Sequence, residues 1–291
     1  MNTEKTQNTL SQDDLIFTYF NRYFQVAPFA LALWRGKEAF SIMDGYIKYE
    51  KMVKGKRNSV DIDSPFKRPL LDVGCGFGEF AGVFFENQVE VGVDISQEDL
   101  IMAQKGEKYK KLFAADARKL PFKSNTFATV LSMSVLEHII HPELAIQEIY
   151  NVLKPGGIFI YTVPTSELNT SLLYPSLLKQ IGLNKISSLY LQSYHKAFKH
   201  VNIMPSRKWL DLTKKAGFEV VCIEGTFSRT LVRWFDFLLP TSLLSQISRW
   251  LFGTRWVWGM SIKRPIVTHI FKTILKDKKT DESNILIIAR K

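Results

Sequence analysis

Acidic residues and glycines gather at two points of the chain where apolar runs end. Residues 70–80 read LLDVGCGFGEF, in which Asp72 precedes three alternating glycines, and sixteen residues after the last glycine the run VEVGVD ends in Asp94. A glycine-rich turn between a strand and a helix brings backbone N–H groups close to a ligand, and an acid at the end of the next strand can accept hydrogen bonds from ribose hydroxyls. The pattern predicts a nucleoside-binding site.

The spacing of the glycines separates one class of nucleoside from another. Gly74, Gly76 and Gly78 follow the pattern G-x-G-x-G, whereas a dinucleotide fingerprint requires G-x-G-x-x-G. A pyrophosphate also favours a helix N-terminus without acids, and Glu79 follows the last glycine. Asp72 directly before the turn suits a cationic ligand. The turn therefore favours a nucleoside without phosphates, with an NAD(P)-dependent oxidoreductase as an alternative.

Strands and helices alternate on both sides of this turn. We expect helices at 79–87, 97–106 and 142–153 between five strands at residues 69–74, 89–96, 111–116, 126–134 and 157–164. A helix over 206–218 and strands over 219–224 and 284–290 follow. Such alternation predicts an α/β fold with a doubly wound parallel sheet and right-handed crossovers.

Four segments surround or interrupt this core. Residues 15–54 carry apolar side chains at helical spacing, broken at Pro28, and with the polar stretch 55–68 they form a predicted N-terminal helical extension over 1–68. The predicted core covers 69–225 and 283–291, and its apolar, aromatic segment 165–205 is expected to cover an acceptor as a lid. Residues 226–282 are too long for a hairpin loop, so we predict a helical insert before the last strand.

The segments LLDVGCGFGEF, VGVDIS, AADARKLPFKSNTFATVLSMSVLEHI and EIYNVLKPGGIFIYTVP, in this order, cover residues 69–164. Together they resemble the class I S-adenosylmethionine (SAM)-dependent methyltransferases, and most nearly the small-molecule branch that includes ubiquinone- and menaquinone-type enzymes. The resemblance implies a Rossmann-like, mostly parallel sheet of seven strands with the last strand antiparallel. It also implies SAM as the cofactor.

The resemblance assigns roles to particular residues. The acid before the turn and the turn backbone would hold the methionine part, Asp94 the ribose hydroxyls, Ile95 the adenine ring and Asp116 the adenine amine. The two residues at the end of the fourth strand would lie next to the sulfonium. The implied cofactor-binding residues are Asp72, Gly74, Cys75, Gly76, Gly78, Asp94, Ile95, Asp116, Ala117, Ser132 and Met133.

The reaction that the resemblance implies is in-line displacement at the methyl carbon of the cofactor, with a small or lipid-linked acceptor. A general base is needed only if the acceptor must lose a proton. His138, just beyond the fourth strand, and His200, in a loop that often covers the acceptor in relatives, are the candidate bases. Packing, helix capping or a loop hydrogen bond are the structural alternatives for both. No metal is expected, since no cluster of His, Cys and acidic residues has ligand spacing.

Composition bounds the setting in which the protein works. The 291 residues carry a net charge of +11, which favours an anionic partner. Two cysteines, Cys75 and Cys222, and an N-terminus without a signal-peptide pattern predict a cytoplasmic protein without disulfides. No apolar run is long enough to span a bilayer.

The insert 226–282 concentrates much of this charge, with ten basic against four acidic residues and four of the six tryptophans. Basic, aromatic and apolar residues on short helices predict contact with an anionic membrane on its inner face, unless the helices pack as a cap on the core. Two further alternatives stay open, a catalytically silent subunit with a SAM fold and a nucleic-acid methyltransferase. The end of the fourth strand reads SMSVLEH. It lacks the Asn/Asp-Pro-Pro-aromatic tetrad that, by resemblance to amino-methylating families, stacks on a flipped base, and this disfavours a nucleic-acid substrate.

Overall fold

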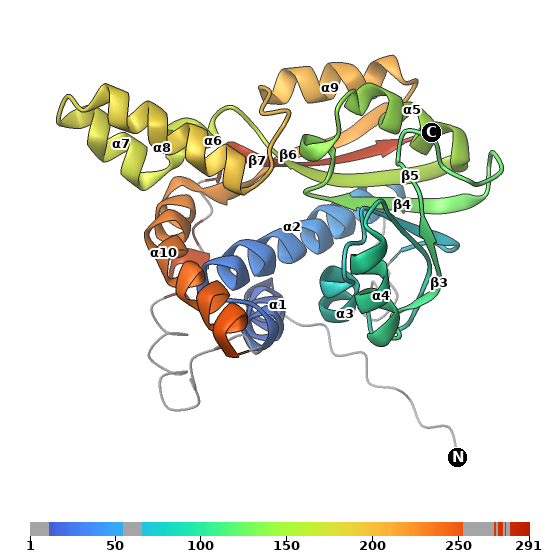
Figure 1. Ribbon diagram of the computed structural model, residues 1–291. Helices are drawn as coiled ribbons and strands as arrows, with labels where there is room; N and C mark the ends of the chain where they lie inside the picture. The colour runs from blue at the N-terminus through green and yellow to red at the C-terminus, as the bar shows by residue number, and fades with distance from the viewer. Residues whose placement is uncertain (1–11, 55–65, 253–270, 272, 276, 278–279) are drawn as a thin grey trace.

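The structure, a computed structural model, describes residues 12–54, 66–252, 271, 273–275, 277 and 280–291. One sheet forms its centre, with strand order β3-β2-β1-β4-β5-β7-β6 (Figure 1). Strand β7 pairs antiparallel with β5 and β6, and every other pair is parallel. The predicted seven-stranded, mostly parallel sheet with an antiparallel last strand is confirmed. The strands are β1 (Leu70–Val73), β2 (Val89–Asp94), β3 (Tyr109–Ala114), β4 (Phe127–Met133), β5 (Leu153–Pro164), β6 (Glu219–Ser228) and β7 (Thr280–Arg290).

Helices cover both faces of the sheet. Alternate side chains of the central strands enter two separate apolar clusters, so that Ile160 faces one side and Phe159 the other. Helices α5 (Pro142–Val152) and α9 (Ser206–Lys215) cover one face. On the opposite face lie α1 (Gln12–Val26), α2 (Phe29–Lys54), α3 (Glu79–Phe84) and α4 (Gln97–Lys105). A short 3-10 helix, η1 (Leu136–His138), follows β4.

The N-terminal helices are integral to the apolar core. Helix α1 ends just before Pro28, as the sequence predicts, and α2 then runs across the sheet. A Cβ atom built on Gly45 of α2 would lie 2.5 Å from Leu286 Cδ2 of β7, so the helix backbone packs directly on the sheet. This close contact brings the middle of α2 to the carboxyl ends of the central strands.

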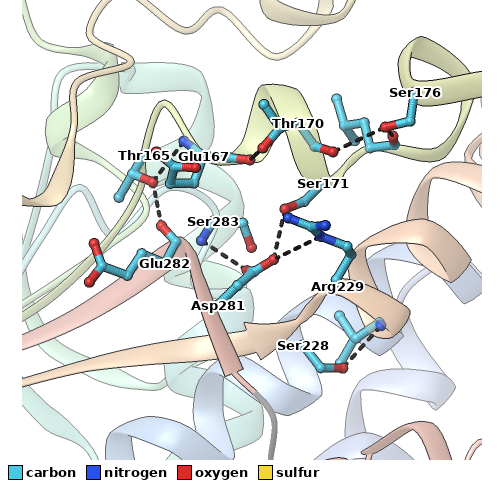
Figure 2. Close-up of polar contacts among 12 residues, drawn as sticks. Thr165, Glu167, Thr170, Ser171, Ser176, Ser228, Arg229, Asp281, Glu282 and Ser283 are labelled. Carbon is cyan, nitrogen blue, oxygen red and sulfur yellow. Dashed lines mark hydrogen bonds and ion pairs between the residues drawn. The ribbon is translucent and has the colours of Figure 1, made fainter. Parts of the chain in front are cut away.

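Residues 165–205 form a helical arm. It consists of α6 (Leu168–Ser171), α7 (Leu173–Gln180) and α8 (Asn184–Ala197), and α7 and α8 project from the body as a hairpin (Figure 1). Figure 2 shows the polar contacts at its base, where Ser171 Oγ donates to Asp281 Oδ2 of β7 at 2.7 Å and Thr165 Oγ1 donates to the Glu282 carbonyl. Arg229 Nε lies 3.9 Å from the same Asp281 carboxylate. The arm is therefore fixed to the last strand.

The insert is shorter than predicted, since it begins later and ends earlier. Residues 226–228 belong to β6 and 280–282 to β7, so the connection between these strands covers 229–279. Its first part is helix α10 (Arg229–Phe252), in which Leu231, Val232 and Phe235 are buried. Asp236 is also buried. This half of α10 packs as a cap on the core, while the tryptophans and basic residues expected at 253–270 lie outside the described residues.

Strands β3 and β5 also begin earlier than predicted. Strand β3 covers Tyr109–Ala114 and ends before Asp116, and β5 begins at Leu153 instead of residue 157. The extension of β5 comes with a shift of register against β4 between Phe127 and Thr129. Among the described helices, none is both long enough and apolar enough to cross a bilayer.

Candidate cofactor and acceptor site

The turn between β1 and α3 takes a backbone conformation that favours glycine. Gly74, Gly76 and Gly78 have φ angles of +76°, +51° and +82°. A Cβ atom on Gly74 would lie 2.4 Å from both Cγ atoms of Val135, so the turn packs directly against the segment that follows β4. A Cβ atom on Gly76 would meet no atom within 4 Å. The turn thus has one side in close packing and one side open to a ligand.

Asp72 lies at the end of β1 beneath this turn and is 2% exposed. Its Oδ2 atom accepts a hydrogen bond from the Tyr109 hydroxyl at 2.7 Å. Burial, only partly offset by this hydrogen bond, raises the pKa of Asp72 to about 6, with a smaller contribution from the nearby Asp94 carboxylate. A buried carboxyl of this kind gains stability from a cation, so Asp72 suits the ammonium group of a ligand.

Asp94 connects the end of β2 to the glycine turn. Its Oδ2 atom accepts from the Gly76 N–H at 2.7 Å and its Oδ1 atom from the Ser96 N–H at 2.9 Å. These two bonds fix the carboxylate, and each oxygen keeps a second lone pair for a ribose hydroxyl. Ile95, which follows Asp94 in sequence, is 75% exposed and presents an apolar surface beside the Asp94 carboxylate.

Cys75 lies inside the turn with its backbone N–H donating to the Val93 carbonyl at 3.0 Å. Burial raises the pKa of its thiol, so the side chain stays uncharged at neutral pH. Cys222 is free as well and partly buried in β6. Both cysteines serve as packing residues, and the Cys75 thiol also donates to the Gly76 carbonyl at 3.8 Å.

Asp116 follows β3 and is already held by a neighbour. Both of its carboxylate oxygens accept from the Arg118 guanidinium, and Oδ1 also accepts from the Arg118 N–H at 2.9 Å. The hydrogen bonds from Arg118 lower the pKa of Asp116. An adenine amine at this site would share the carboxylate with Arg118. Ala117 packs against the apolar cluster on the α5 side of the sheet.

The end of β4 leads into the candidate acceptor site. Ser132 and Met133 are buried, and among the described residues Ser132 Oγ has no hydrogen-bond partner. Ser134 has a φ angle of +52° and donates from Oγ to Glu38 Oε1 at 2.7 Å. Ser134, rather than Ser132 or Met133, reaches the cavity that lies beyond this strand end.

The cavity has a volume of about 90 Å³ and is mostly apolar and aromatic. It is bounded by α2, the segment after β4, the end of α8 and its following loop, and α10. Because Val135 contacts Gly74 while its neighbour Ser134 lines the cavity, the cavity adjoins the glycine turn. The lining residues are Leu31, Trp34, Arg35, Ser134, Glu137, His138, Pro164, Tyr194, Phe198, His200 and Phe235.

Both predicted histidines line this cavity. The rings of His138 and His200 are stacked, with centroids 5.6 Å apart. Burial lowers the pKa of His138, and burial together with His138 and His195 lowers the pKa of His200 to about 3. Both imidazoles are therefore neutral near pH 7 and each can accept a proton.

A third histidine, for which the sequence offers no supporting pattern, determines which nitrogen of His200 is available. His195 Nε2 lies 2.7 Å from Asn169 Oδ1, and since an amide oxygen only accepts, that nitrogen carries a proton. His195 Nδ1 is then an acceptor for His200 Nδ1 at 3.0 Å. With its proton on Nδ1, neutral His200 keeps a lone pair on Nε2.

Sequence reasoning also missed the charged residues that α2 and η1 bring to the cavity. Glu137 is 1% exposed, burial raises the pKa of its carboxyl to about 8, and its Oε2 atom has no partner among the described residues. Arg35 donates to Glu38 at 2.7 Å beside it. The Glu137 carbonyl accepts from Val201 N–H at 2.9 Å, which fixes the loop carrying His200.

The arrangement fits a SAM-type nucleoside better than a phosphate-bearing one. Its observed elements are an open glycine cradle, a buried acid at the end of β1 and a second acid fixed on the cradle. Buried acids at this position repel a pyrophosphate and attract a cation. Within the described ranges, no cluster of three or more His, Cys, Asp or Glu side chains could hold a metal ion.

Comparison with known families agrees with this geometry. Residues 71–161 match the family described as a methyltransferase domain. The matched segment contains the glycine turn, both acids of the cradle and the end of β4. It excludes eight of the eleven cavity residues, which lie in α2, at the end of β5, in α8 and the loop after it, and in α10.

Individual relatives match about half of the chain or less. An uncharacterized protein of Methanocaldococcus jannaschii is 28% identical over 151 residues, which are 51% of this chain and 63% of that protein. A tRNA (carboxymethyluridine(34)-5-O)-methyltransferase of Arabidopsis thaliana is 35% identical over 113 residues, 36% of this chain and 26% of that protein. The chain thus spans less than two thirds of these relatives' length.

A solved structure supports the fold. A Galdieria sulphuraria protein, described as a candidate sarcosine dimethylglycine methyltransferase, superposes with a TM-score of 0.51 and 14% identity over 85% of this chain and 83% of that one. At this identity the likeness bears on the fold alone. It agrees with a Rossmann-like sheet that carries the glycine turn at the end of its first strand.

Proposed function

We propose that this chain, which belongs to the class I SAM-dependent methyltransferases, transfers the methyl group of SAM to an acceptor bound in the aromatic cavity beyond β4. The observation that carries the proposal is the contact between the glycine turn and the cavity, made by Gly74 and the Ser134–Val135 segment. A cofactor held by the turn would present its reactive end to a molecule in the cavity. When bound, SAM supplies a methyl carbon activated by the adjacent sulfonium.

The residues of the turn have distinct tasks in this proposal. Asp72 attracts the ammonium of the methionine part, and the backbone of Gly74, Cys75, Gly76 and Gly78 allows its close approach. The next acid along the sheet, Asp94, accepts from the ribose hydroxyls. Burial of the Asp72 carboxyl strengthens its polar contacts, since water does not compete for them.

The adenine end lies farther along the carboxyl edge of the sheet. Ile95 packs on the adenine, and Asp116 with Ala117 borders its amine side. Ser132 and Met133 shape the floor beneath the sulfonium from inside the strand. The packed wall and the aromatic cavity exclude water and align the acceptor, which is most of the protein's task when the methyl group is already activated.

His200 is the proposed base for an acceptor that must lose a proton. Its Nε2 lone pair is available, its pKa is low enough to keep it neutral, and it lines the cavity. His138 supports it from the stacked position. The buried Glu137 carboxyl, with a pKa of about 8, can donate a hydrogen bond to a polar group of the same acceptor.

The acceptor class follows from the lining. Trp34, Tyr194, Phe198 and Phe235 favour a planar or apolar molecule, and the polar groups favour one that carries a hydroxyl or amine. The relatives do not specify it, because one methylates a tRNA uridine and another norajmaline by their names. We extend the proposal to a lipid-linked acceptor and a cytoplasmic protein peripheral to the membrane. The buried face of α10 gives no support for membrane contact through the first part of the insert.

A labelled-methyl assay tests the proposal. Purified protein is incubated with methyl-labelled SAM and fractionated extract of its host, and label should appear in one extractable species. His200→Gln should lower the rate by about 10²-fold with unchanged SAM affinity. His141→Gln, at an exposed histidine outside the cavity, is the control. Absence of labelled product from every fraction would contradict the proposal.

A further inference from the structure

The tip of the α7–α8 hairpin exposes an unusual amount of apolar surface. Five aliphatic side chains there are 41–69% exposed, although they lie within thirteen residues of one another. Leu177 and Ile181 are four residues apart, and Ile186 and Leu189 are three apart, so each pair lies on one side of its helical segment. We call this surface the apolar tip, and it consists of Leu177, Ile181, Leu183, Ile186 and Leu189.

The hairpin that carries the apolar tip is firmly attached to the rest of the protein. Its base is fixed by the Ser171–Asp281 hydrogen bond (Figure 2). Asp236 of α10, which is fully buried, accepts from the Tyr174 N–H at 3.0 Å and from the Tyr190 hydroxyl. Between the two helices, Ser187 Oγ donates to the Pro175 carbonyl at 3.0 Å. A rigid hairpin therefore holds the apolar tip away from the body of the protein.

Charge around the tip is of one sign. From residue 168 to residue 210 the chain has six lysines and arginines and no aspartate or glutamate. Lys179 and Lys185 flank the apolar tip directly and are exposed. Neither forms an ion pair with any acid in the described part of the chain. Lysines around exposed aliphatic side chains suit a surface with negative headgroups above an apolar interior.

We propose that the apolar tip inserts into the headgroup region of an anionic lipid bilayer, with Lys179 and Lys185 on the headgroups. A second copy of this chain is a poorer occupant, because a two-fold contact would bring like-charged lysines together in a protein that already carries +11. In this proposal the apolar tip takes the membrane-binding role that the sequence predicts for the insert, because α10 buries its apolar face in the core.

The position of the hairpin connects this contact to the cavity. The tip lies at the start of α8, and Tyr194 near the end of the same helix lines the cavity with Phe198 and His200 of the following loop. About ten residues of helix, roughly 15 Å, separate these two ends, so lipid contact at the tip would hold the cavity within one helix length of the bilayer. This connection rests on the proposed function, and it implies that the acceptor comes from the membrane.

Vesicle flotation of the full-length protein tests the proposal. The protein should float with vesicles of phosphatidylcholine and phosphatidylglycerol and stay behind with phosphatidylcholine alone. The double variant Ile181→Gln, Leu189→Gln should lose roughly tenfold in bound fraction at limiting lipid. Ile101→Gln with Leu144→Gln, two aliphatic residues of similar exposure on α4 and α5, should bind as the unmodified protein does.

The contribution of charge is tested by flotation of the double variant Lys179→Glu, Lys185→Glu. Its control is the double variant Lys214→Glu, Lys215→Glu, at exposed positions of α9. Only the first pair should abolish flotation. Unchanged flotation of both tip variants would overturn the proposal, as would a dimer in solution that the tip variants convert to monomers. Calorimetry with SAM separates the two claims, because loss of flotation with normal SAM affinity concerns the tip, and absence of SAM binding concerns the proposed function.

Discussion

The Asp72 carboxyl is the residue whose environment most directly indicates a cation. It is buried, it accepts a hydrogen bond from a tyrosine hydroxyl, and burial raises its pKa to about 6. The native protein therefore holds this proton more tightly than the unfolded chain does. Ionisation of Asp72 lowers the stability of the ligand-free protein as the pH rises from about 4 to 6, and a bound ammonium would offset this cost.

Replacement of Asp72 separates stability from binding. Asp72→Asn should leave the free energy of unfolding at pH 7.5 unchanged or higher by on the order of 1 kcal/mol, because a buried charge is removed. The same change should weaken SAM binding about tenfold or more. Urea unfolding and calorimetry measure the two quantities. The exposed acid Glu98 provides the control Glu98→Gln, which should alter neither.

The pH dependence of binding follows from the same group. With a pKa of about 6, Asp72 is largely ionised at pH 7 and largely protonated at pH 5. SAM affinity of the unmodified protein should fall about tenfold between these values, and the Asp72→Asn variant should lose this dependence. An equal pH dependence in both proteins would show that another group governs binding.

Gly74 and Gly76 form a matched pair within one turn, since both have positive φ angles. Gly74→Ala should lower the free energy of unfolding by about 3 kcal/mol, because its Cβ would overlap Val135. Gly76→Ala should cost only about 1 kcal/mol, since its Cβ enters open space, yet it should block SAM binding. Equal stability of the two variants, or normal SAM affinity of Gly76→Ala, would contradict the proposed placement of the ligand.

The sequence predicts those site residues that local patterns define. Asp72, the three glycines and Asp94 stand at strand ends that hydrophobic runs identify, so their position follows from the parallel sheet. Glu38 and His195 were not predictable. Glu38 reaches Ser134 across 96 residues of sequence, and His195 meets Asn169 across 26, with no periodic pattern to indicate either contact. Such contacts depend on tertiary packing alone.

The hairpin and α10 depend on one buried carboxylate. Asp236 accepts from Tyr174 and Tyr190 of the hairpin, and burial raises its pKa despite these bonds. Asp236→Ala would leave a backbone N–H and a hydroxyl without an acceptor. It should lower the free energy of unfolding by about 2–4 kcal/mol and expose residues 172–199 to limited proteolysis. Tyr190→Phe removes a single donor and should cost about 1 kcal/mol. Equal protease resistance of Asp236→Ala and the unmodified protein would contradict this anchoring role.

The sequence predicts where helices form more reliably than where they pack. The helical spacing of 15–54 and the break at Pro28 appear in α1 and α2 as expected. That α2 crosses the sheet and supplies Trp34 and Arg35 to the cavity does not follow from its sequence, because residues 55–68 are polar and carry no indication of direction. The apolar face of α10 was compatible with either a bilayer or a core, and only packing distinguishes them.

The whole molecule divides its tasks between two sets of elements. The strands and loops within 71–161, which match the methyltransferase domain, hold the predicted cofactor site. Eight of the eleven residues that line the acceptor cavity lie outside this match, in α2, β5, the arm and α10. This division explains why the family and cofactor are readable from sequence while the acceptor is not. The basic, apolar arm is a further feature that the family match does not cover.

Calorimetric titration of the full-length protein with SAM, S-adenosylhomocysteine and NADH tests the central claim most directly. One saturable site for each of the two sulfur nucleosides, lost in Asp94→Ala and absent for NADH, is the predicted result. Binding of NADH without any heat from SAM or S-adenosylhomocysteine would contradict the assignment of the glycine turn.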